Sequence, residues 1–535
     1  MDMFPIDIQE QKRYTKFELL EIFDCSENRL MSILRKLKEY GVVKTVKISK
    51  EQINSFELLN EDVIITDISK NKDDSYYVFT YVGVVIIKNF VIRCFPKYLF
   101  NNEKPKENLK QIIKVIEKYN SKEEIIYLEN QIDDTEVFNL LSLMLFLIDD
   151  YHKNGLYTHI HNFIDANNDG EILWDKTINE TYAFIVDNTP YYLELYTKNS
   201  KKDDLNYFKL LHEIILTKCS KELEKADLLD LFDLTSVELT DRTLESFDDS
   251  ESILYKINQE ISSEYNSHKQ ILLKTFYAYV SNKHFELGDL DCFSMYGTTS
   301  YNLIWEKMCS FVLNDKKGNM LKDLNLPTSL KEKYDGTKTL SSIIEKPFWY
   351  GFDDEKRVFK KRSEYTLKPD ILTIYQNKDN EFEFIILDAK YYNLQLEYDL
   401  DLKGQPEIES ITKQYMYELC FKEFVNENGF SEIKNCFLFP TEKNEIINKG
   451  YVELNFLHKI PLKNIQLILL PANLINEYYL NEKLLDISCL KLKDFEEEED
   501  GTISKKIKDI NHLRISEKSM KKVFRKNSAM NKIKK

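Results

Sequence analysis

The chain has 535 residues, of which 43% are hydrophobic, and a formal net charge of −16 at neutral pH. This length allows about three or four domains, each with its own core. The negative charge argues against a protein that binds DNA over most of its surface, because contacts with phosphates supply much of the binding energy of such proteins. We therefore expect either a local positive surface or a partner that delivers the DNA.

Several kinds of site are excluded by the absence of their motifs. No Gly-x-x-x-x-Gly-Lys-Ser/Thr loop occurs, so the chain should not hydrolyse nucleoside triphosphates by itself. The 8 cysteines form no Cys-x-x-Cys pair, which argues against a structural zinc site. The N-terminus has no signal-peptide pattern, and the longest apolar stretch, 137–148, is too short to cross a bilayer. We expect a cytoplasmic protein that does not bind membranes.

Residues 1–60 are expected to form a winged-helix-like domain. Thr15 and Glu18 have the spacing of a capping box for a first helix, and Ser26 can cap a second helix that runs to Tyr40. A glycine then ends the helix, and the apolar run after it is typical of a wing strand. The second helix is basic and could contact DNA, but this fold also serves in protein contacts and in packing. We keep both interpretations.

The next segments are predicted to be β-rich and then helical. Residues 61–105 contain two predicted strands on either side of a turn at Gly83. Residues 106–290 are predicted to be a mainly helical region that includes the partner interface. Two acidic tracts in it, 227–233 and 241–251, indicate either a solvated face or a contact for a basic partner.

Residues 481–535 form an acidic and then basic tail. The basic part could bind DNA phosphates, or it could fold onto the acidic run that precedes it. The sequence favours neither interpretation over the other.

The most informative segment lies in residues 291–480. Asp370 opens a short predicted strand, a polar turn follows at 377–380, and a second strand ends at Asp388-Ala389-Lys390. A hairpin about this turn brings Asp370 to within about one residue of Asp388, although the pattern does not fix the register. Because side chains alternate along a strand, Asp388 and Lys390 share a face.

Two carboxylates and an amine at the end of a strand suit phosphodiester hydrolysis. Mg²⁺ takes oxygen ligands, so Asp370 and Asp388 can hold it, and the ion can then polarise a phosphate and activate a bound water. Lys390 can orient that water and offset the charge of the transition state. The alternative is an exposed hairpin with ordinary charges, because aspartate and lysine are abundant in this chain.

Neighbouring helices supply two supporting residues. Glu306 lies beside the apolar stripe of a predicted helix at 301–313, where a carboxylate is costly unless it is paired or binds a metal. Gln414 lies on a second predicted helix, 411–419, close to a lysine and a tyrosine that could contact phosphate oxygens with it. Two predicted strands downstream extend the hairpin into a sheet, so the order is helix, hairpin, helix and strands.

That order, together with the Pro-Asp…Asp-x-Lys residues, resembles the PD-(D/E)XK nuclease superfamily, with Asp388 where many members have Glu. The wider chain, over roughly residues 65–475, resembles the LlaJI-type restriction endonuclease family, which is related to the McrC subunit of the McrBC system. In chain order, the residues that carry the resemblance are Tyr81-Val82-Gly83-Val84, Cys94-Phe95-Pro96-Lys97-Tyr98, Gly170-Glu171-Ile172-Leu173-Trp174, Val237-Glu238-Leu239-Thr240-Asp241, Ile304-Trp305-Glu306, Pro369-Asp370, Asp388-Ala389-Lys390 and Lys413-Gln414-Tyr415.

The resemblance implies an α+β multidomain protein whose C-terminal α/β domain is a PD-(D/E)XK nuclease. It implies cleavage of double-stranded DNA together with a separate McrB-like AAA+ GTPase subunit. We predict Asp370, Asp388 and Glu306 as ligands of Mg²⁺, and these three residues with Lys390 and Gln414 as the catalytic set. Two alternatives stay open, a standalone DNA repair nuclease and a non-catalytic adaptor that keeps the nuclease fold for docking. The intact Asp-Asp-Lys set argues against the adaptor.

Overall fold

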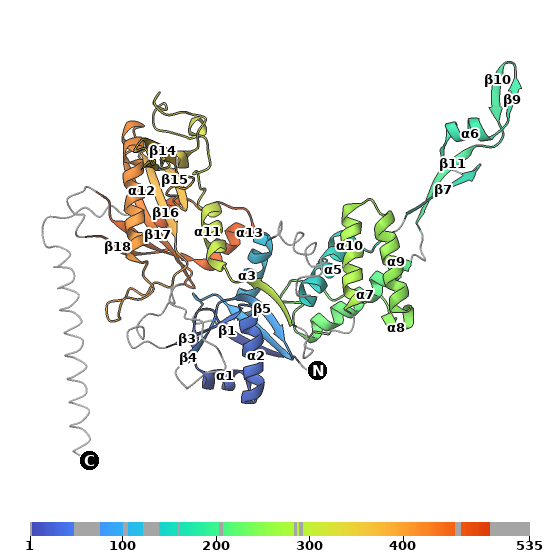
Figure 1. Ribbon diagram of the computed structural model, residues 1–535, viewed down its shortest axis with the longest axis horizontal. Helices are drawn as coiled ribbons and strands as arrows, with labels where there is room; N and C mark the ends of the chain where they lie inside the picture. The colour runs from blue at the N-terminus through green and yellow to red at the C-terminus, as the bar shows by residue number, and fades with distance from the viewer. Residues whose placement is uncertain are drawn as a thin grey trace, which may run out of the picture. The chain divides into compact units, whose positions relative to one another are not determined.

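The protein is described from a computed structural model, and it is a mixed α+β chain with several separate sheets (Figure 1). The structure describes residues 3–47, 75–99, 105–120, 139–158, 160–167, 170–202, 207–282, 286–287, 293–454 and 462–492. The predicted tail, from residue 493 on, lies outside them. No helix within these ranges combines the length and the apolar character that crossing a bilayer requires.

The first helices and the first small sheet agree with the sequence prediction. In chain order the elements are β2 (Arg13–Tyr14), α1 (Lys16–Phe23), α2 (Glu27–Glu39), β3 (Val43–Lys47) and β4 (Ser75–Phe79), with strand order β2-β4-β3. The capping box at Thr15 and Glu18 forms in both directions. Ser26 is the N-cap residue of α2 but forms no side-chain cap bond, and Gly41 follows the end of α2 with φ +70°. Both helices bury their apolar faces in one core with these strands.

A four-stranded sheet follows in the same core, and it corrects the prediction of a turn at Gly83. Its spatial order is β1 (Phe4–Gln9), β6 (Phe90–Phe95), β5 (Val82–Ile87) and β12 (Phe293–Thr298). Gly83 lies inside β5 opposite Gly297 of β12, and both have positive φ. A Cβ atom on Gly83 would lie 2.2 Å from the carbonyl oxygen of Tyr296. The glycine therefore permits close strand approach rather than chain reversal.

The predicted helical region contains helices, but strands interrupt it. The helices are α3 (Pro105–Asn120), α5 (Leu140–Asn154), α7 (Tyr207–Lys225), α8 (Leu244–Phe247), α9 (Ser250–Ser263) and α10 (Ser267–Ser281). The helical prediction does not hold for residues 160–202, which we call the arm. The arm consists of β7 (Ile160–Ala166), β8 (Glu171–Ile172), α6 (Trp174–Glu180), β9 (Ala183–Val186), β10 (Thr189–Tyr192) and β11 (Tyr196–Lys202).

Local residue types explain the strands of the arm. β9 and β10 are rich in β-branched and aromatic residues, which favour strands. The two residues that connect them, Asp187 and Asn188, both have positive φ, at 49° and 62°. Aspartate and asparagine tolerate this conformation, and a two-residue turn of this kind matches the twist of a hairpin.

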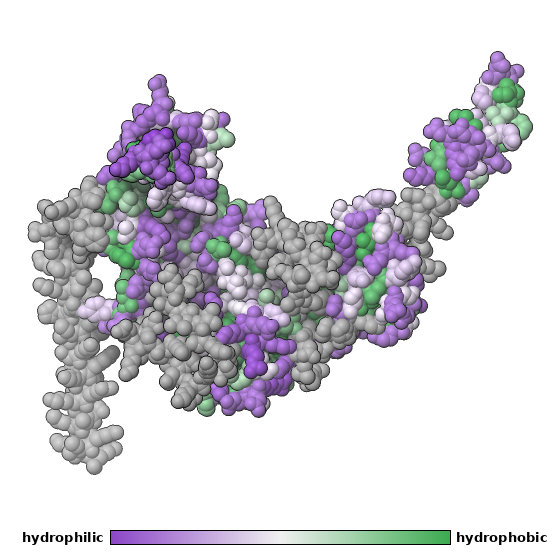
Figure 2. Space-filling model, viewed as in Figure 1, coloured by the Kyte–Doolittle hydropathy of each residue, from purple (hydrophilic) through white to green (hydrophobic). Residues whose placement is uncertain are grey.

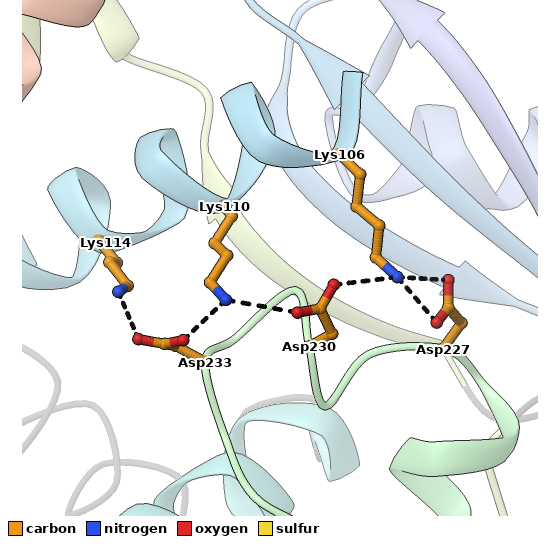
Figure 3. A network of polar contacts seen from close by, with 6 residues as sticks. All are labelled: Lys106, Lys110, Lys114, Asp227, Asp230 and Asp233. Atoms are coloured by element: carbon orange, nitrogen blue, oxygen red, sulfur yellow. Dashed lines mark hydrogen bonds and ion pairs between the residues drawn. The ribbon is translucent and has the colours of Figure 1, made fainter. Parts of the chain in front are cut away.

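The first acidic tract is paired with α3 of the same chain (Figure 3). This Lys–Asp ladder consists of ion pairs of 2.5 to 3.4 Å that run in the order Asp227, Lys106, Asp230, Lys110, Asp233 and Lys114. The hydrogen bonds from Lys110 and Lys114 lower the pKa of Asp233 to about 2. The basic partner that the sequence suggested for this tract is therefore α3 itself.

The C-terminal sheet has five strands and helices packed against it. Its spatial order is β15 (Ile371–Gln376), β16 (Phe382–Ala389), β17 (Glu432–Thr441), β19 (Ile465–Pro471) and β18 (Ile447–Val452), and the helices are α11 (Tyr301–Val312), α12 (Ile408–Glu427) and α13 (Ala472–Leu480). Short 3-10 turns occur at η2 (Leu321–Asp323), η3 (Leu340–Ile343) and η5 (Ile487–Leu490).

The three central strands of this sheet run parallel and are buried along almost their whole length. Such burial is expected for parallel strands that helices cover. Phe421 and Phe424 of α12 pack on Phe384 of β16, and Trp305 of α11 is fully buried. The predicted hairpin, the helices on either side of it and the two strands downstream are confirmed.

Candidate active site

The β15–β16 hairpin places Asp370 opposite Asp388. Ile371 pairs with Leu387 in the antiparallel ladder, so the next position outward on each strand is an aspartate. The main-chain N–H of Ala389 donates to Oδ2 of Asp370 over 3.1 Å, which holds this carboxylate against the end of β16. The sequence did not fix the register of this hairpin, and the register in the structure brings both acids together.

The turn of the hairpin explains this register. The side-chain oxygen of Asn377 accepts hydrogen bonds from the N–H groups of Asp379 at 3.0 Å and Glu381 at 2.9 Å. Asn380 has φ +63°, a conformation that asparagine tolerates. The side chain of Asn377 thus closes the loop and sets the strand pairing.

Lys390 joins the acids as the alternation of the strand predicted. Its Nζ lies 3.1 Å from Oδ2 of Asp388, and its main-chain N–H donates to the carbonyl of Leu438 on β17 over 2.9 Å. Asp388 is only 6% exposed, and within the described part of the chain its Oδ1 has no hydrogen-bond partner. One buried carboxylate oxygen is thus left for a further ligand.

The charges at this site oppose one another. Burial raises the pKa of Asp388 well above its usual range, and a hydrogen bond with Asp370 and repulsion by its charge raise it further. Lys390 acts in the opposite direction on Asp388. Burial opposes the charge of Lys390 too, yet the carboxylates of Asp388 and Asp370 hold its pKa above the usual value. Two acids against one lysine leave a surplus of negative charge that a cation would offset.

Glu306 of α11 faces the same charges. Burial is the main cause that raises its pKa to about 7, and the negative charge of Asp370 adds to it, while Lys390 and Lys317 oppose the rise. Glu306 is half-buried and follows the fully buried Trp305 along α11. Among the described residues, no three or more histidine, cysteine, aspartate or glutamate side chains are grouped so that they could hold a metal ion. A shared metal site of Glu306, Asp370 and Asp388 stays a prediction.

The structure places Gln414 differently from the carboxylates. It is fully buried on α12, and its Nε2 donates to the main-chain carbonyls of Ile386 at 3.4 Å and Cys436 at 3.3 Å. These contacts join α12 to β16 and β17, and none of them involves Asp370, Asp388 or Lys390. Gln414 therefore positions the strand that carries Asp388.

Two neighbours of Gln414 on α12 have separate positions. Lys413 pairs with Glu409 on the exposed face of the helix, at 2.7 Å. The hydroxyl of Tyr417 donates to the carbonyl of Lys368 over 2.9 Å. Burial, and then the charges of Asp388 and Asp370, raise the pKa of Tyr417. Tyr417 therefore lies near the acids, whereas Lys413 does not join them.

Lys317 is a site residue that the sequence analysis missed. Its Nζ donates to the main-chain carbonyl of Asp370 and lies 3.2 Å from Asp315. Asp315 in turn accepts hydrogen bonds from the N–H groups of Leu372 and Lys317, both at 3.0 Å. The signal in the sequence was weak, because Asp315-Lys316-Lys317 is an ordinary charged turn after a helix.

Two facing aspartates and a lysine lie at the end of this sheet, with Asp388 buried and the other two half-buried, and such a set suits phosphodiester hydrolysis. The family model for the LlaJI restriction endonuclease matches residues 81–473, which is most of the chain, so the chain belongs to the LlaJI restriction endonuclease family. Its resemblance to that family, inferred from sequence landmarks, is confirmed.

Individual relatives add detail. The chain is 26% identical over 417 residues to the type II restriction enzyme BsuMI component YdjA of Bacillus subtilis, over 76% of this chain and 81% of the relative. Among solved structures, it aligns with a chain of the Thermococcus gammatolerans half-complex of McrB AAA+ hexamers with bound McrC, at 10% identity and a TM-score of 0.34, over 89% and 99% of the two chains. The match to the McrBC complex of the same organism has 12% identity and a TM-score of 0.24, over 57% and 85%. At such low TM-scores the two structural matches carry no argument.

Proposed function

We propose that this chain is the Mg²⁺-dependent DNA endonuclease subunit of a bacterial restriction system, with a PD-(D/E)XK nuclease domain at its C-terminal end. The observation that carries the proposal is the Asp-Asp-Lys geometry: Asp370 and Asp388 face each other across a hairpin, and Lys390 lies 3.1 Å from Asp388. The order α11, β15, β16, α12, β17 supports the nuclease fold.

The residues of the site fit a magnesium ion. The unpartnered Oδ1 of Asp388 is a buried oxygen, the type of ligand that Mg²⁺ prefers, and Asp370 adds a second carboxylate opposite it. The raised pKa of Asp388 has the direction expected for two acids that lack a counter-charge. When bound, the ion would polarise the phosphate and lower the pKa of a water molecule.

The remaining side chains have separate roles in this proposal. Lys390, half-buried and held by Asp388, offsets negative charge that develops on the phosphate. Glu306, with a pKa of about 7, can accept or release a proton near neutral pH. Lys317 and Gln414 fix the main chain on either side of the acids, so we assign them to positioning.

Partner dependence is the second part of the proposal. A relative is named as a component of a restriction enzyme, and this chain contains no phosphate-binding loop of its own. The arm exposes apolar surface, and green patches are visible on it in Figure 2. Its exposed large side chains include Tyr182, Phe184, Ile185, Val186 and Leu193. An apolar surface of this kind marks a protein contact. We propose that the arm, within residues 106–290, contacts an McrB-like AAA+ GTPase that delivers double-stranded DNA.

The test is cleavage of plasmid DNA by the full chain with its co-purified GTPase, GTP and Mg²⁺. We expect Lys390→Ala to lower the rate by at least about 100-fold, a loss typical of removing one charge-stabilising group. Lys378→Ala removes an exposed lysine at the other end of the same hairpin and should leave the rate unchanged. Full cleavage by the Lys390→Ala protein would exclude this active site.

The same assay separates the alternatives. Efficient cleavage by the isolated chain, without the GTPase or nucleotide, would favour a standalone DNA repair nuclease. Failure of the complete complex to cut any DNA, methylated or not, would favour a non-catalytic adaptor.

A further inference from the structure

A second hairpin in the C-terminal part of the chain is exposed on both of its faces. It consists of β13 (Phe348–Phe352) and β14 (Val358–Arg362), paired antiparallel. Every residue of both strands is exposed except Gly351, and Trp349 and Phe352 are 69% and 74% exposed. Two strands alone are only marginally stable in water, and an exposed aromatic ribbon invites association. This surface is therefore expected to bind a partner.

Aromatic and basic side chains alternate across the ribbon. On one face Phe348 lies opposite Arg362 and Tyr350 opposite Lys360; on the other, Trp349 lies opposite Lys361. Nζ of Lys360 is 3.6 Å from the centre of the Phe348 ring and 5.4 Å from that of Tyr350. Each face thus presents rings and cations together.

A specific contact between the two strands supports the pairing of the ribbon. The ring of Phe359 covers Gly351, and a Cβ atom on Gly351 would lie 2.5 Å from the Cζ atom of Phe359. A cross-strand ring over a glycine protects the backbone and pins the register. A larger residue in place of Gly351 would displace this ring, so the glycine favours the pairing that alternates rings with cations.

The positive charge of β14 is not neutralised by acids nearby. Arg357, before the strand, pairs with Asp353 at 2.8 Å and Glu355 at 3.1 Å, which uses the acids of the turn. Within the described residues, no carboxylate forms an ion pair with the three cations of β14, which are Lys360, Lys361 and Arg362. A row of three available cations on a chain of net charge −16 is a local site for a polyanion.

The ribbon is also tied to the candidate active site. At its base, the N–H of Ser363 donates to the carbonyl of Pro347, and the hydroxyl of Thr366 to that of Glu345, both over 2.8 Å. Arg362 precedes Asp370 by only eight positions, a span of at most about 28 Å. This is less than one turn of duplex DNA, about 34 Å. DNA bound at Asp370 therefore passes within reach of the ribbon.

We propose that the β13–β14 ribbon binds double-stranded DNA beside the cleaved bond, with its three cations on phosphates and its aromatic rings against sugars and base edges. A two-stranded ribbon fits the major groove, and exposed rings can also lodge between base steps. The proposal rests on the proposed nuclease function, since it is that function which brings duplex DNA to Asp370. It gives the substrate of that site a basic binding element on a chain whose net charge is −16.

The experiment measures binding separately from cleavage. Full-length protein is titrated into a fluorescein-labelled duplex in EDTA, over a series of salt concentrations. The variant combines Lys360→Gln, Lys361→Gln and Arg362→Gln. We expect it to lower the slope of log affinity against log salt by about 2 to 3, since each phosphate contact contributes about 0.9.

A charge-matched control lies on the same part of the chain. Exposed lysines outside the ribbon are replaced together, as Lys322→Gln, Lys331→Gln and Lys338→Gln. This control should keep the wild-type slope. Equal slopes for the ribbon variant and the control, or no binding of the duplex by wild-type protein even at the lowest salt, would overturn the proposal.

Trp349 supplies an independent signal. The chain has 3 tryptophans, and Trp305 is fully buried. We expect DNA to quench tryptophan fluorescence in wild-type protein and much less in Trp349→Phe, which should keep its affinity because phenylalanine retains the ring. Trp349→Ala should bind about 10-fold more weakly, in line with the loss of one stacked ring. Equal melting temperatures would exclude misfolding of the variants.

The outcomes distinguish the two proposals. If the ribbon variant loses DNA affinity while the complete complex cuts no DNA, the ribbon is a DNA-binding element but the nuclease proposal fails, and with it the placement of the ribbon beside a cleaved bond. If the complete complex cuts DNA and the ribbon variant binds the duplex like the control, the nuclease proposal stands and the ribbon proposal fails. If sedimentation shows that the ribbon variants lose self-association instead of DNA affinity, the ribbon is a contact between copies of the chain and the DNA proposal is wrong.

Discussion

Replacing Glu306 by glutamine should stabilise the metal-free protein at alkaline pH. Its pKa is raised from 4.5 to about 7, chiefly by burial and then by the charge of Asp370. Because the folded protein binds this proton more tightly than the unfolded chain does, stability is fully present below pH 4.5 and falls as the pH rises through 7. A shift of about 2.5 units corresponds to roughly 3 kcal/mol as an upper bound, since one unit is about 1.4 kcal/mol.

Glutamine keeps the shape of the side chain and has no proton to lose. In EDTA, urea unfolding of Glu306→Gln and wild-type protein should therefore give similar free energies near pH 4.5. By pH 8 the variant should be more stable, by about 1 to 3 kcal/mol. Glu332→Gln, which removes an exposed carboxylate, should show no such divergence.

Magnesium should reduce this difference. A cation near Asp370 and Asp388 relieves the repulsion that Glu306 experiences, and binding to the folded state stabilises it by mass action. Wild-type protein should therefore gain more stability from Mg²⁺ at pH 8 than Glu306→Gln does. A stability difference that stays constant from pH 5 to 8 would refute the electrostatic account of the site.

Three other predictions concern the scaffold. Burial lowers the pKa of His212 from 6.5 to about 4. The free energy of unfolding of wild-type protein, measured with urea, should therefore fall by about 3 kcal/mol as the pH falls from 6.5 to 4. The His212→Asn protein should not show that loss. Replacing the three lysines of the Lys–Asp ladder by glutamine should destabilise the protein by about 1 to 2 kcal/mol at low salt and by less in 1 M NaCl, as expected for exposed ion pairs. Gly83→Ala should lower the melting temperature sharply, because its Cβ would meet the carbonyl of Tyr296; an unchanged melting point would contradict the close strand approach.

The core of the candidate site could be predicted from the sequence because local chemistry sets it. Asn377 and Asn380 favour one tight turn, and the period of two along β16 then puts Asp388 and Lys390 on one face. Only the strand pairing had to be found in the structure. Glu306 was recognisable for a similar reason, since a carboxylate beside an apolar stripe is costly without a role.

Other features depend on contacts that the pattern does not carry. Helical periodicity indicated that Gln414 could share a face with its neighbours, but not that it would face the sheet rather than the acids. The contact of Lys317 with the carbonyl of Asp370 joins segments 53 positions apart. The prediction of a mainly helical region did not include the strands of the arm, which depend on the two-residue turn at Asp187 and Asn188.

The Lys–Asp ladder changes what the first acidic tract means. The sequence of this tract shows Asp227, Asp230 and Asp233 as three anions, although each lies within ion-pair distance of a lysine on α3. The field of a charge paired with its opposite decays with distance much faster than that of a single charge, and salt shortens it further. At the Lys–Asp ladder, a polyanion that approaches the surface therefore experiences the field of a row of dipoles and little net repulsion. The tract 227–233 is thus less of a local barrier to DNA than its own sequence implies, although the net charge of the chain is unchanged at −16.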